Sequence, residues 1–208
     1  GSLLDRLQAA PVGLRDLLTM TADAASGMVY LHAHDPVILH RDLKTANLLV
    51  DARGRVKIAD FGLSRPQADD GLMTACGTPK YAAPEVLNHS RYGTAADVWS
   101  FGVIIWECWC LEPPYKDTPA LQVCVKVAAV GSFLEMPSHF PPCLAALVNR
   151  CLRFQPEDRP SFQEVYAELR AMLDLAGQTG AATDAGVVIA GGSGIGGGGA
   201  ASAAAEAP

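Results

Sequence analysis

The stretch His40-Arg41-Asp42-Leu43-Lys44-Thr45-Ala46-Asn47 decides the interpretation of this 208-residue chain. It lies between two short apolar runs, 37–39 and 48–50, and Asp60-Phe61-Gly62 follows a third run at 56–59. Both polar segments, 40–47 and 60–62, therefore fall on loops at the ends of small strands. Any one of these residues alone would be interpreted as part of a solvated turn. Together they match phosphoryl transfer, in which Mg²⁺ takes hard oxygen ligands, the transferred group needs positive charge and a hydroxyl nucleophile needs a carboxylate.

The rest of the chain is predicted to be mainly α with a few short β-strands. Apolar residues recur at helical spacing from Leu14 to Leu31, and the pattern ends before Pro36, which cannot continue a helix. A second helix is predicted from Thr94-Ala95-Ala96-Asp97, a sequence similar to a capping box. It is apolar on all sides through Trp106, so we expect it to be the buried axis of the fold. Further helices are predicted to begin at 117–119, near Pro142 and at the capping box 161–164.

The composition excludes several classes of protein. Half of the residues are apolar, 18% are charged and the net charge is −6, which is typical of a globular protein and not of a nucleic-acid binder. The most apolar window, 98–111, has the length of a core helix and is broken by Ser100 and Glu107, so no membrane anchor is predicted. The six cysteines lack paired spacing, which favours reduced thiols and a cytoplasmic, reducing location.

The chain changes character at Gly177. Of the 32 residues from 177 to 208, 10 are Gly and 10 are Ala, so this segment buries too little to offset its backbone entropy. We expect a disordered tail over 177–208 and a folded domain over 1–176. Within the tail, Val187-Val188-Ile189-Ala190 and the glycines after it imitate a dinucleotide-binding turn. A nucleotide-cofactor protein is therefore an alternative, but it rests on these abundant glycines alone.

Three strings of sequence carry a resemblance to a known family. His40-Arg41-Asp42 with Asn47, Asp60-Phe61-Gly62 and Ala83-Pro84-Glu85 resemble, in this order, the large C-terminal lobe of a eukaryotic-type protein kinase. Two later strings, 97–102 and 158–160, are similar to further landmarks of the family. The resemblance covers roughly residues 1–175 and is closest to Ser/Thr kinases of the tyrosine-kinase-like group. It implies a kinase-like C-terminal lobe over 1–176, with the N-terminal lobe absent from this chain.

The resemblance implies catalytic roles for the matching residues. Asp42 would accept or orient the proton of the substrate hydroxyl, and Lys44 would offset charge on the phosphoryl oxygens. Asn47, also a catalytic residue, and Asp60 would ligate Mg²⁺. Lys44, Asn47, Leu49 and Asp60 would contact ATP. The implied cofactors are therefore ATP and Mg²⁺.

Other matching residues imply regulation and substrate binding. The loop from 60 to 85 resembles a kinase activation segment, in which Thr74 matches a phosphorylated position. Arg41 and Arg65 match the cations that hold this phosphate, and we expect Arg41 to be unpaired before Thr74 is modified. Thr78 matches a residue that contacts the substrate.

A last group of matching residues implies structural roles. Glu85 and Arg159 match a buried ion pair of the family. Asp97 matches an acceptor of backbone hydrogen bonds from the catalytic loop, although a capping role alone would also explain it. His40 and Phe61 are expected to pack and not to react.

The function implied by the resemblance is ATP-dependent phosphoryl transfer to Ser and Thr hydroxyls of protein substrates. The chain opens on Gly1 without a targeting signal, and we expect the missing small lobe, which supplies the roof of the ATP pocket, to lie upstream. The chain alone is expected to be inactive. Protein substrates and an activating kinase are the implied partners. The alternative is a catalytically inactive lobe that acts as a protein-interaction module.

The activation-segment assignment yields a first prediction. Replacing Thr74 with alanine is expected to lower the activity of the full enzyme, because the phosphate that would bind Arg41 and Arg65 cannot form. The measurement is the rate of phosphate transfer after incubation with an activating kinase. Equal rates for Thr74→Ala and the unaltered enzyme would contradict the assignment.

Overall fold

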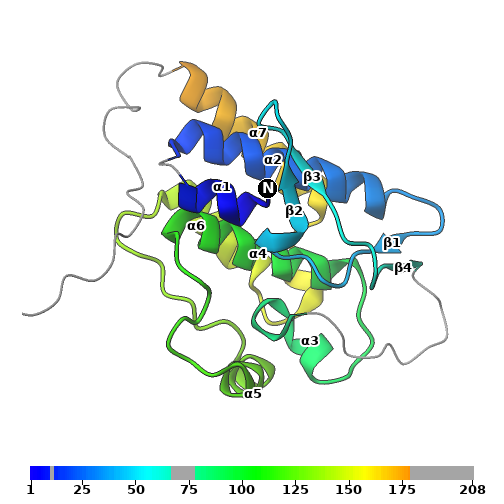
Figure 1. The fold of residues 1–208 in the computed structure, drawn as a ribbon. Coiled ribbons are helices and arrows are strands. Elements are labelled where there is room, and N and C mark those ends of the chain that lie inside the picture. The colour runs from blue at the N-terminus through cyan, green and yellow to red at the C-terminus, as the bar shows by residue number, and fades with distance from the viewer. Residues whose placement is uncertain (10–11, 67–77, 179–208) are drawn as a thin grey trace, which may run out of the picture.

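The computed structural model describes residues 1–9, 12–66 and 78–178, and these are mostly helical with a few short strands (Figure 1). This confirms the predicted fold class. The elements follow the order α1 (Leu3–Ala9), α2 (Leu14–His32), β1 (Ile38–Leu39), η1 (Thr45–Asn47), β2 (Leu48–Val50), β3 (Val56–Ile58), β4 (Arg65–Pro66), η2 (Pro79–Tyr81), α3 (Pro84–Leu87), α4 (Thr94–Cys110), α5 (Ala120–Val130), α6 (Pro142–Cys151), η3 (Pro156–Asp158) and α7 (Phe162–Gln178), where η marks a single 3₁₀ turn.

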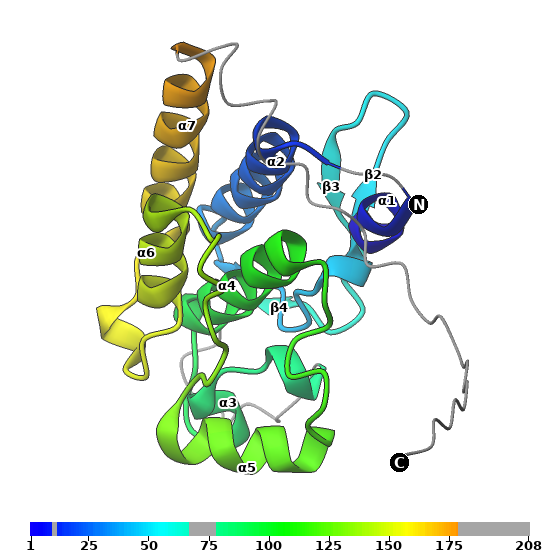
Figure 2. The same cartoon turned by 90° about the vertical axis from the view of Figure 1, so that its left-hand side faces the viewer.

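Helix α4 is the buried axis, as the sequence predicts. Its Phe101 and Ile104 belong to the main hydrophobic core, while Trp99 and Val103 belong to a second core beside α5. Figure 2 shows α4 in the middle of the molecule, with α2 and α7 on one side and α5 at the lower end. Gly102 lets α4 approach α6 closely, since a Cβ atom there would lie 2.8 Å from the Cβ of Cys151.

Helix α4 begins at Thr94, as predicted, but its cap differs from the prediction. The N-cap residue is Gly93, and no side chain caps the helix. The predicted capping box over 94–97 is therefore wrong. The physical reason is that the carboxylate of Asp97 is turned toward donors outside the helix, which are described below.

The other predicted helix starts agree with the structure. Helix α6 begins at Pro142, and α5 begins at Ala120 directly after the predicted start at 117–119. At α7 the capping box is formed, because the Ser161 N–H donates to Glu164 Oε2 at 2.7 Å and the Glu164 N–H donates to Ser161 Oγ at 3.3 Å. Helix α7 runs to Gln178, so the first two residues of the predicted tail are helical. Residues 179–208 lie outside the described part of the chain.

Two small antiparallel sheets frame the polar loops. Strands β2 and β3 form a hairpin with Leu49 opposite Lys57, and β1 pairs with β4, which the sequence analysis did not anticipate. The turn between β2 and β3 places Gly54 at φ 76°, a conformation that favours glycine. The loop 40–47 thus connects β1 to the hairpin, and Asp60 follows β3.

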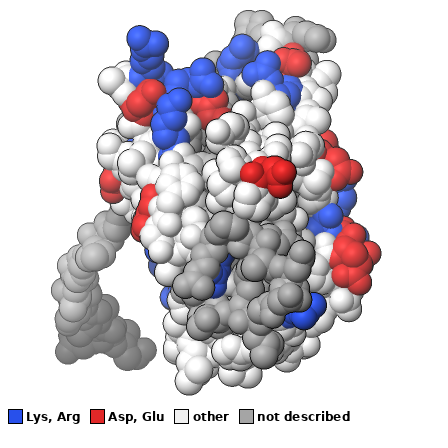
Figure 3. Space-filling model, turned by 90° about the vertical axis from the view of Figure 1, so that its right-hand side faces the viewer, with Lys and Arg blue, Asp and Glu red and all other residues white. Residues whose placement is uncertain are grey.

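Charged and close-packed contacts hold the hairpin against α2. Arg55 on the hairpin donates to Asp23 of α2 through Nε at 2.6 Å, and the same carboxylate accepts the Val56 N–H at 3.2 Å. Gly27 of α2 lets the Ile58 side chain pack closely against the helix, because a Cβ atom there would lie 2.7 Å from Ile58 Cδ1. Figure 3 shows Lys and Arg side chains gathered at the upper end of one face, the end where the hairpin lies in Figure 1.

A buried ion pair joins α3 to the segment before α7. Arg159 donates to both carboxylate oxygens of Glu85, at 2.7 and 2.8 Å, and the two side chains are 0% and 8% exposed. The same guanidinium donates to the carbonyl oxygens of Ala95 and Phe154. The predicted contact between Glu85 and Arg159 is present, and it ties α3 to the helical body.

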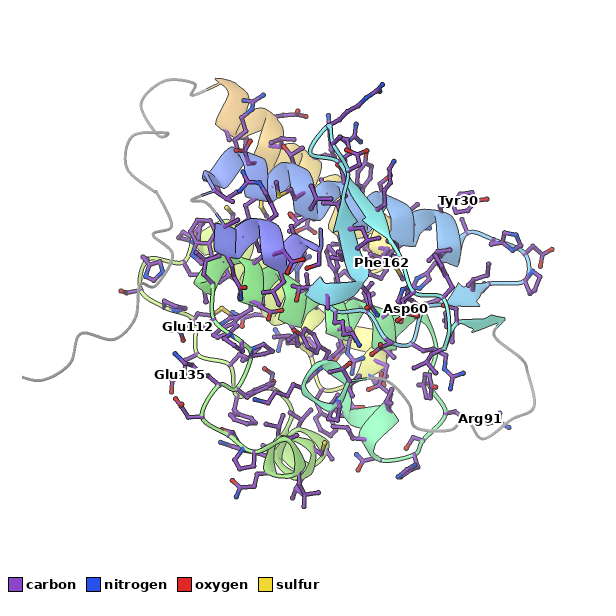
Figure 4. All side chains as sticks on the ribbon, in the orientation of Figure 1. Tyr30, Asp60, Arg91, Glu112, Glu135 and Phe162 are labelled. Atoms are coloured by element: carbon purple, nitrogen blue, oxygen red, sulfur yellow. The ribbon has the colours of Figure 1, made fainter. Side chains whose placement is uncertain are left out.

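Removing one partner of this pair should be costly. We expect Glu85→Ala to lower the free energy of unfolding by about 3–5 kcal/mol, because the Arg159 charge stays buried without its carboxylate. Denaturant-induced unfolding measures the loss. Glu112→Ala is the control, since Glu112 lies at the surface (Figure 4), 3.9 Å from Lys116, and should change stability by less than about 0.5 kcal/mol. Equal losses in both variants would contradict the buried-pair argument.

Candidate active site

Asp97 fixes the backbone of the loop that carries the polar motif. Its buried carboxylate accepts the N–H of His40 at 3.0 Å, the N–H of Arg41 at 3.0 Å and a hydrogen bond with His32 Nε2 at 2.9 Å. Arg41 has a φ of 70°, which a residue other than glycine rarely adopts. The bonds to Asp97 hold this strained conformation and so set the direction in which Asp42 enters the site.

Asp42 is the centre of a compact hydrogen-bond network. Lys44 Nζ donates to Asp42 Oδ2 at 2.6 Å, and Thr78 Oγ1 donates to Asp42 Oδ1 at 2.8 Å. Lys44 Nζ also lies 2.8 Å from Thr78 Oγ1 and donates to it. Asn47 Nδ2 donates to the Asp42 carbonyl oxygen at 2.9 Å and to Oδ2 at 3.2 Å. Four residues that the sequence singled out therefore meet at one carboxylate.

This network determines the charge of Asp42. Burial by itself raises the pKa of a carboxyl group, but the hydrogen bonds from Lys44 and Thr78 favour the ionised form. Their combined effect holds the pKa of Asp42 below its usual value. Asp42 is therefore an ionised hydrogen-bond acceptor at neutral pH.

Asp60 and Leu49 lie near this network. Asp60, at φ 62°, is exposed on the loop after β3, and its carboxylate accepts the Gly62 N–H at 3.3 Å (Figure 4). The neighbouring Ala59 N–H donates to the Asn47 carbonyl oxygen at 2.9 Å, which links the two loops. An exposed carboxylate and an amide oxygen on linked loops are donors that suit Mg²⁺. Leu49 is 45% exposed on β2, as a residue on the floor of a nucleotide pocket would be.

His40 packs, as predicted. Its side chain is fully buried, its Nε2 lies 3.1 Å from the Ala59 carbonyl oxygen, and its ring centroid lies 5.6 Å from that of Phe61. Phe61 remains about half exposed on its other side. His40 therefore acts as a spacer between the loop 40–47 and the segment that holds Asp60.

The structure describes two of the three residues assigned to regulation, Arg41 and Arg65. Arg41 Nε donates to the Tyr92 hydroxyl at 2.8 Å, so the prediction that Arg41 is unpaired is wrong. Local sequence patterns do not reveal this contact, because Tyr92 lies 51 positions later in the chain. Arg65 pairs through its backbone with Leu39 in the small sheet. Thr74 lies outside the described residues.

Sequence reasoning missed one buried acidic residue near the site. Glu107, on α4, accepts hydrogen bonds from Thr45 and Tyr81 and is 3% exposed. The sequence analysis used Glu107 only as a break in an apolar window. An acidic residue within a helix that is otherwise apolar on all sides is itself a signal of a buried polar contact.

Comparison with known proteins decides the family. A family model described as protein tyrosine and serine/threonine kinase matches residues 1–169. This chain belongs to the protein kinase family. The recognised resemblance to Ser/Thr kinases of the tyrosine-kinase-like group is thereby confirmed.

Individual relatives of this kinase chain agree with the family assignment. It is 46% identical over 156 residues to probable serine/threonine-protein kinase drkA of Dictyostelium discoideum, covering 75% of this chain and 24% of the relative. It is 44% identical over 164 residues to serine/threonine-protein kinase CTR1 of Arabidopsis thaliana, covering 76% and 20%. The Arabidopsis kinase STY17 is 40% identical over 161 residues, covering 77% and 28%. The chain thus spans between a fifth and about a quarter of the length of these relatives.

Among residues 1–9, 12–66 and 78–178, no helix combines the length and the apolar character that crossing a membrane requires.

The network around Asp42 yields a prediction about its protonation. In Thr78→Val one hydrogen bond to the carboxylate is lost, so the pKa of Asp42 should rise from its lowered value. NMR titration of the side-chain carboxyl carbons measures this change. Asp51 is an internal control, because its pKa is lowered by the backbone N–H groups of Arg55 and Arg53 and should not move. An unchanged pKa of Asp42 would show that Thr78 does not influence its ionisation.

Proposed function

We propose that the protein containing this chain transfers the γ-phosphoryl group of ATP to Ser and Thr hydroxyls of proteins. The observation that carries the proposal is the convergence of Lys44, Asn47 and Thr78 on the carboxylate of Asp42. No structural role requires a cation, an amide and a hydroxyl around one ionised acid. The relatives named as serine/threonine-protein kinases support the choice of substrate hydroxyl.

The residues around Asp42 have separate tasks in this reaction. Asp42, ionised at neutral pH, accepts or orients the proton of the attacking hydroxyl. Lys44 lies within hydrogen-bond distance of Asp42 and Thr78, where its charge offsets negative charge on the transferred group. Thr78 begins the segment on which the substrate peptide would lie. The bonds among these side chains hold them in place before the substrate binds.

The nucleotide would be held by the linked loops. Asn47 and Asp60 provide the oxygen ligands for Mg²⁺, Lys44 provides positive charge and the exposed Leu49 provides an apolar contact. Magnesium, when bound with ATP, neutralises phosphate charge during the transfer. The exposed carboxylate of Asp60 accepts the backbone N–H of Gly62 at 3.3 Å.

The proposal extends to the whole protein. The relatives are several times longer than this chain, which supports a small lobe upstream with a Gly-rich loop and a strand lysine. We include protein substrates and an activating kinase that modifies Thr74 as partners. A cytoplasmic location is part of the proposal and is supported by the free thiols of Cys108, Cys124 and Cys143.

Asp42→Asn in the full-length protein tests the proposal. The variant keeps the size of the side chain but loses its charge, and we expect the rate of phosphate transfer from labelled Mg·ATP to Ser/Thr proteins to fall by about 10²–10⁴-fold. Asp51→Asn is the matched control, because asparagine can maintain the turn in which Asp51 accepts the Arg53 and Arg55 N–H groups.

Two results would overturn the proposal. One is a full-length protein that contains the small lobe but transfers no phosphate to protein hydroxyls. The other is an Asp42→Asn variant as active as Asp51→Asn, which would remove Asp42 from the chemistry. A folded but inactive full-length protein would favour the interaction-module alternative.

A further inference from the structure

Glu107 is a buried acid that the proposed mechanism does not use. It lies on α4 and is 3% exposed. One carboxylate oxygen, Oε2, accepts the Thr45 hydroxyl at 2.8 Å and the Tyr81 hydroxyl at 2.6 Å. Burial raises the pKa of Glu107, and the two hydroxyl groups partly offset this effect. Burying an acid is unfavourable unless its hydrogen bonds are made. These two contacts therefore stabilise Glu107 in its buried position.

Each hydroxyl partner belongs to a short turn that reaches Asp42. Thr45 is the first residue of η1, and Asn47, its last residue, donates to Asp42. Tyr81 is the last residue of η2, and its N–H donates to the carbonyl oxygen of Thr78 at 2.9 Å. The hydroxyl of Thr78 in turn donates to Asp42 at 2.8 Å. Both turns therefore run from Glu107 to the same catalytic carboxylate.

These contacts form a closed ring. Starting at Asp42, it passes through η1 to Thr45, across the carboxylate of Glu107 to Tyr81, and through η2 back to Asp42. In each turn a backbone hydrogen bond, from Asn47 N–H to the Lys44 carbonyl oxygen or from Tyr81 N–H to the Thr78 carbonyl oxygen, restricts the dihedral angles between its ends. Moving either turn away from Glu107 would therefore move Asn47 or Thr78 relative to Asp42.

We propose that Glu107 is a positioning residue that sets how Asn47 and Thr78 meet Asp42. The proposal rests on the proposed function, because it concerns the geometry of the same phosphoryl-transfer site. A carboxylate suits this role, since one of its oxygens can accept both hydroxyl hydrogens while α4 keeps it fixed in the core. Glu107 acts through the two hydroxyl groups that it binds, and not by contact with the substrate hydroxyl or the transferred phosphoryl group.

Removing one donor at a time tests the ring. In the full-length protein, Tyr81→Phe and Thr45→Val are each expected to lower kcat by about tenfold, since each deletes a hydrogen bond to the buried carboxyl group of Glu107. The KM for ATP should stay within about twofold, because the nucleotide contacts are not removed. Glu107→Gln keeps an oxygen that can accept both hydroxyls, so its kcat should lie closer to that of the unaltered protein.

Two matched controls separate positioning from stability. Tyr115→Phe removes a buried hydroxyl that lies 3.2 Å from Ser132 Oγ, and Thr21→Val removes a buried hydroxyl that donates to the Leu17 carbonyl oxygen at 2.9 Å. Neither control residue contacts Glu107 in these bonds. Both controls should keep kcat unchanged even if their melting temperatures fall as much as those of the test variants. A decrease in kcat that is equal in test and control variants would overturn the proposal.

A measurement that needs no activity completes the test. If the ring aligns Thr78 with Asp42, Tyr81→Phe should shift the NMR signals of the Thr78 side chain, whereas the control Thr21→Val should leave them unchanged. An unaltered protein that transfers no phosphate would contradict the proposed function, and the NMR result alone would then decide this inference. Thr78 signals that are the same in Tyr81→Phe and in the unaltered protein would overturn it.

Discussion

The three hydrogen bonds to the Asp97 carboxylate are the interaction on which the site depends. They join the buried helix α4 to the end of α2, through His32, and to the backbone of His40 and Arg41. The strained backbone at Arg41 persists because these bonds compensate for it. The rigid core thereby determines where the side chain of Asp42 lies.

Helix α4 contributes two buried acids with different partners. Asp97 holds backbone groups before Asp42, while Glu107 holds hydroxyl groups after it. The reacting groups therefore lie on loops, but an apolar helix with very few polar residues sets their geometry. This arrangement explains why α4 combines near-complete burial with two carboxylates.

The sequence predicted the parts of the fold that have long periodic patterns or strong start signals. Apolar spacing predicts α2, apolar character on all sides predicts α4, and the capping box predicts the start of α7, while the motif indicates the residues around Asp42. The short elements could not be predicted, because α3 has four residues and β4 has two, too few for a period to show. The cap at 94–97 was predicted wrongly because local spacing does not reveal that Asp97 has partners 56 and 57 positions away. The partner of Arg41 was missed for the same reason.

Sequence separation also constrains how the site can form. The contacts from α4 to the catalytic loop join residues 56, 57 and 62 positions apart. Closing such long loops costs chain entropy before any contact repays it. A nascent chain that ends before α4 therefore contains every residue of the loop 40–47 but lacks the carboxylates of Asp97 and Glu107 that hold it. The arrangement of the side chains around Asp42 therefore forms only after helix α4 has been synthesised and packed, which is late in folding.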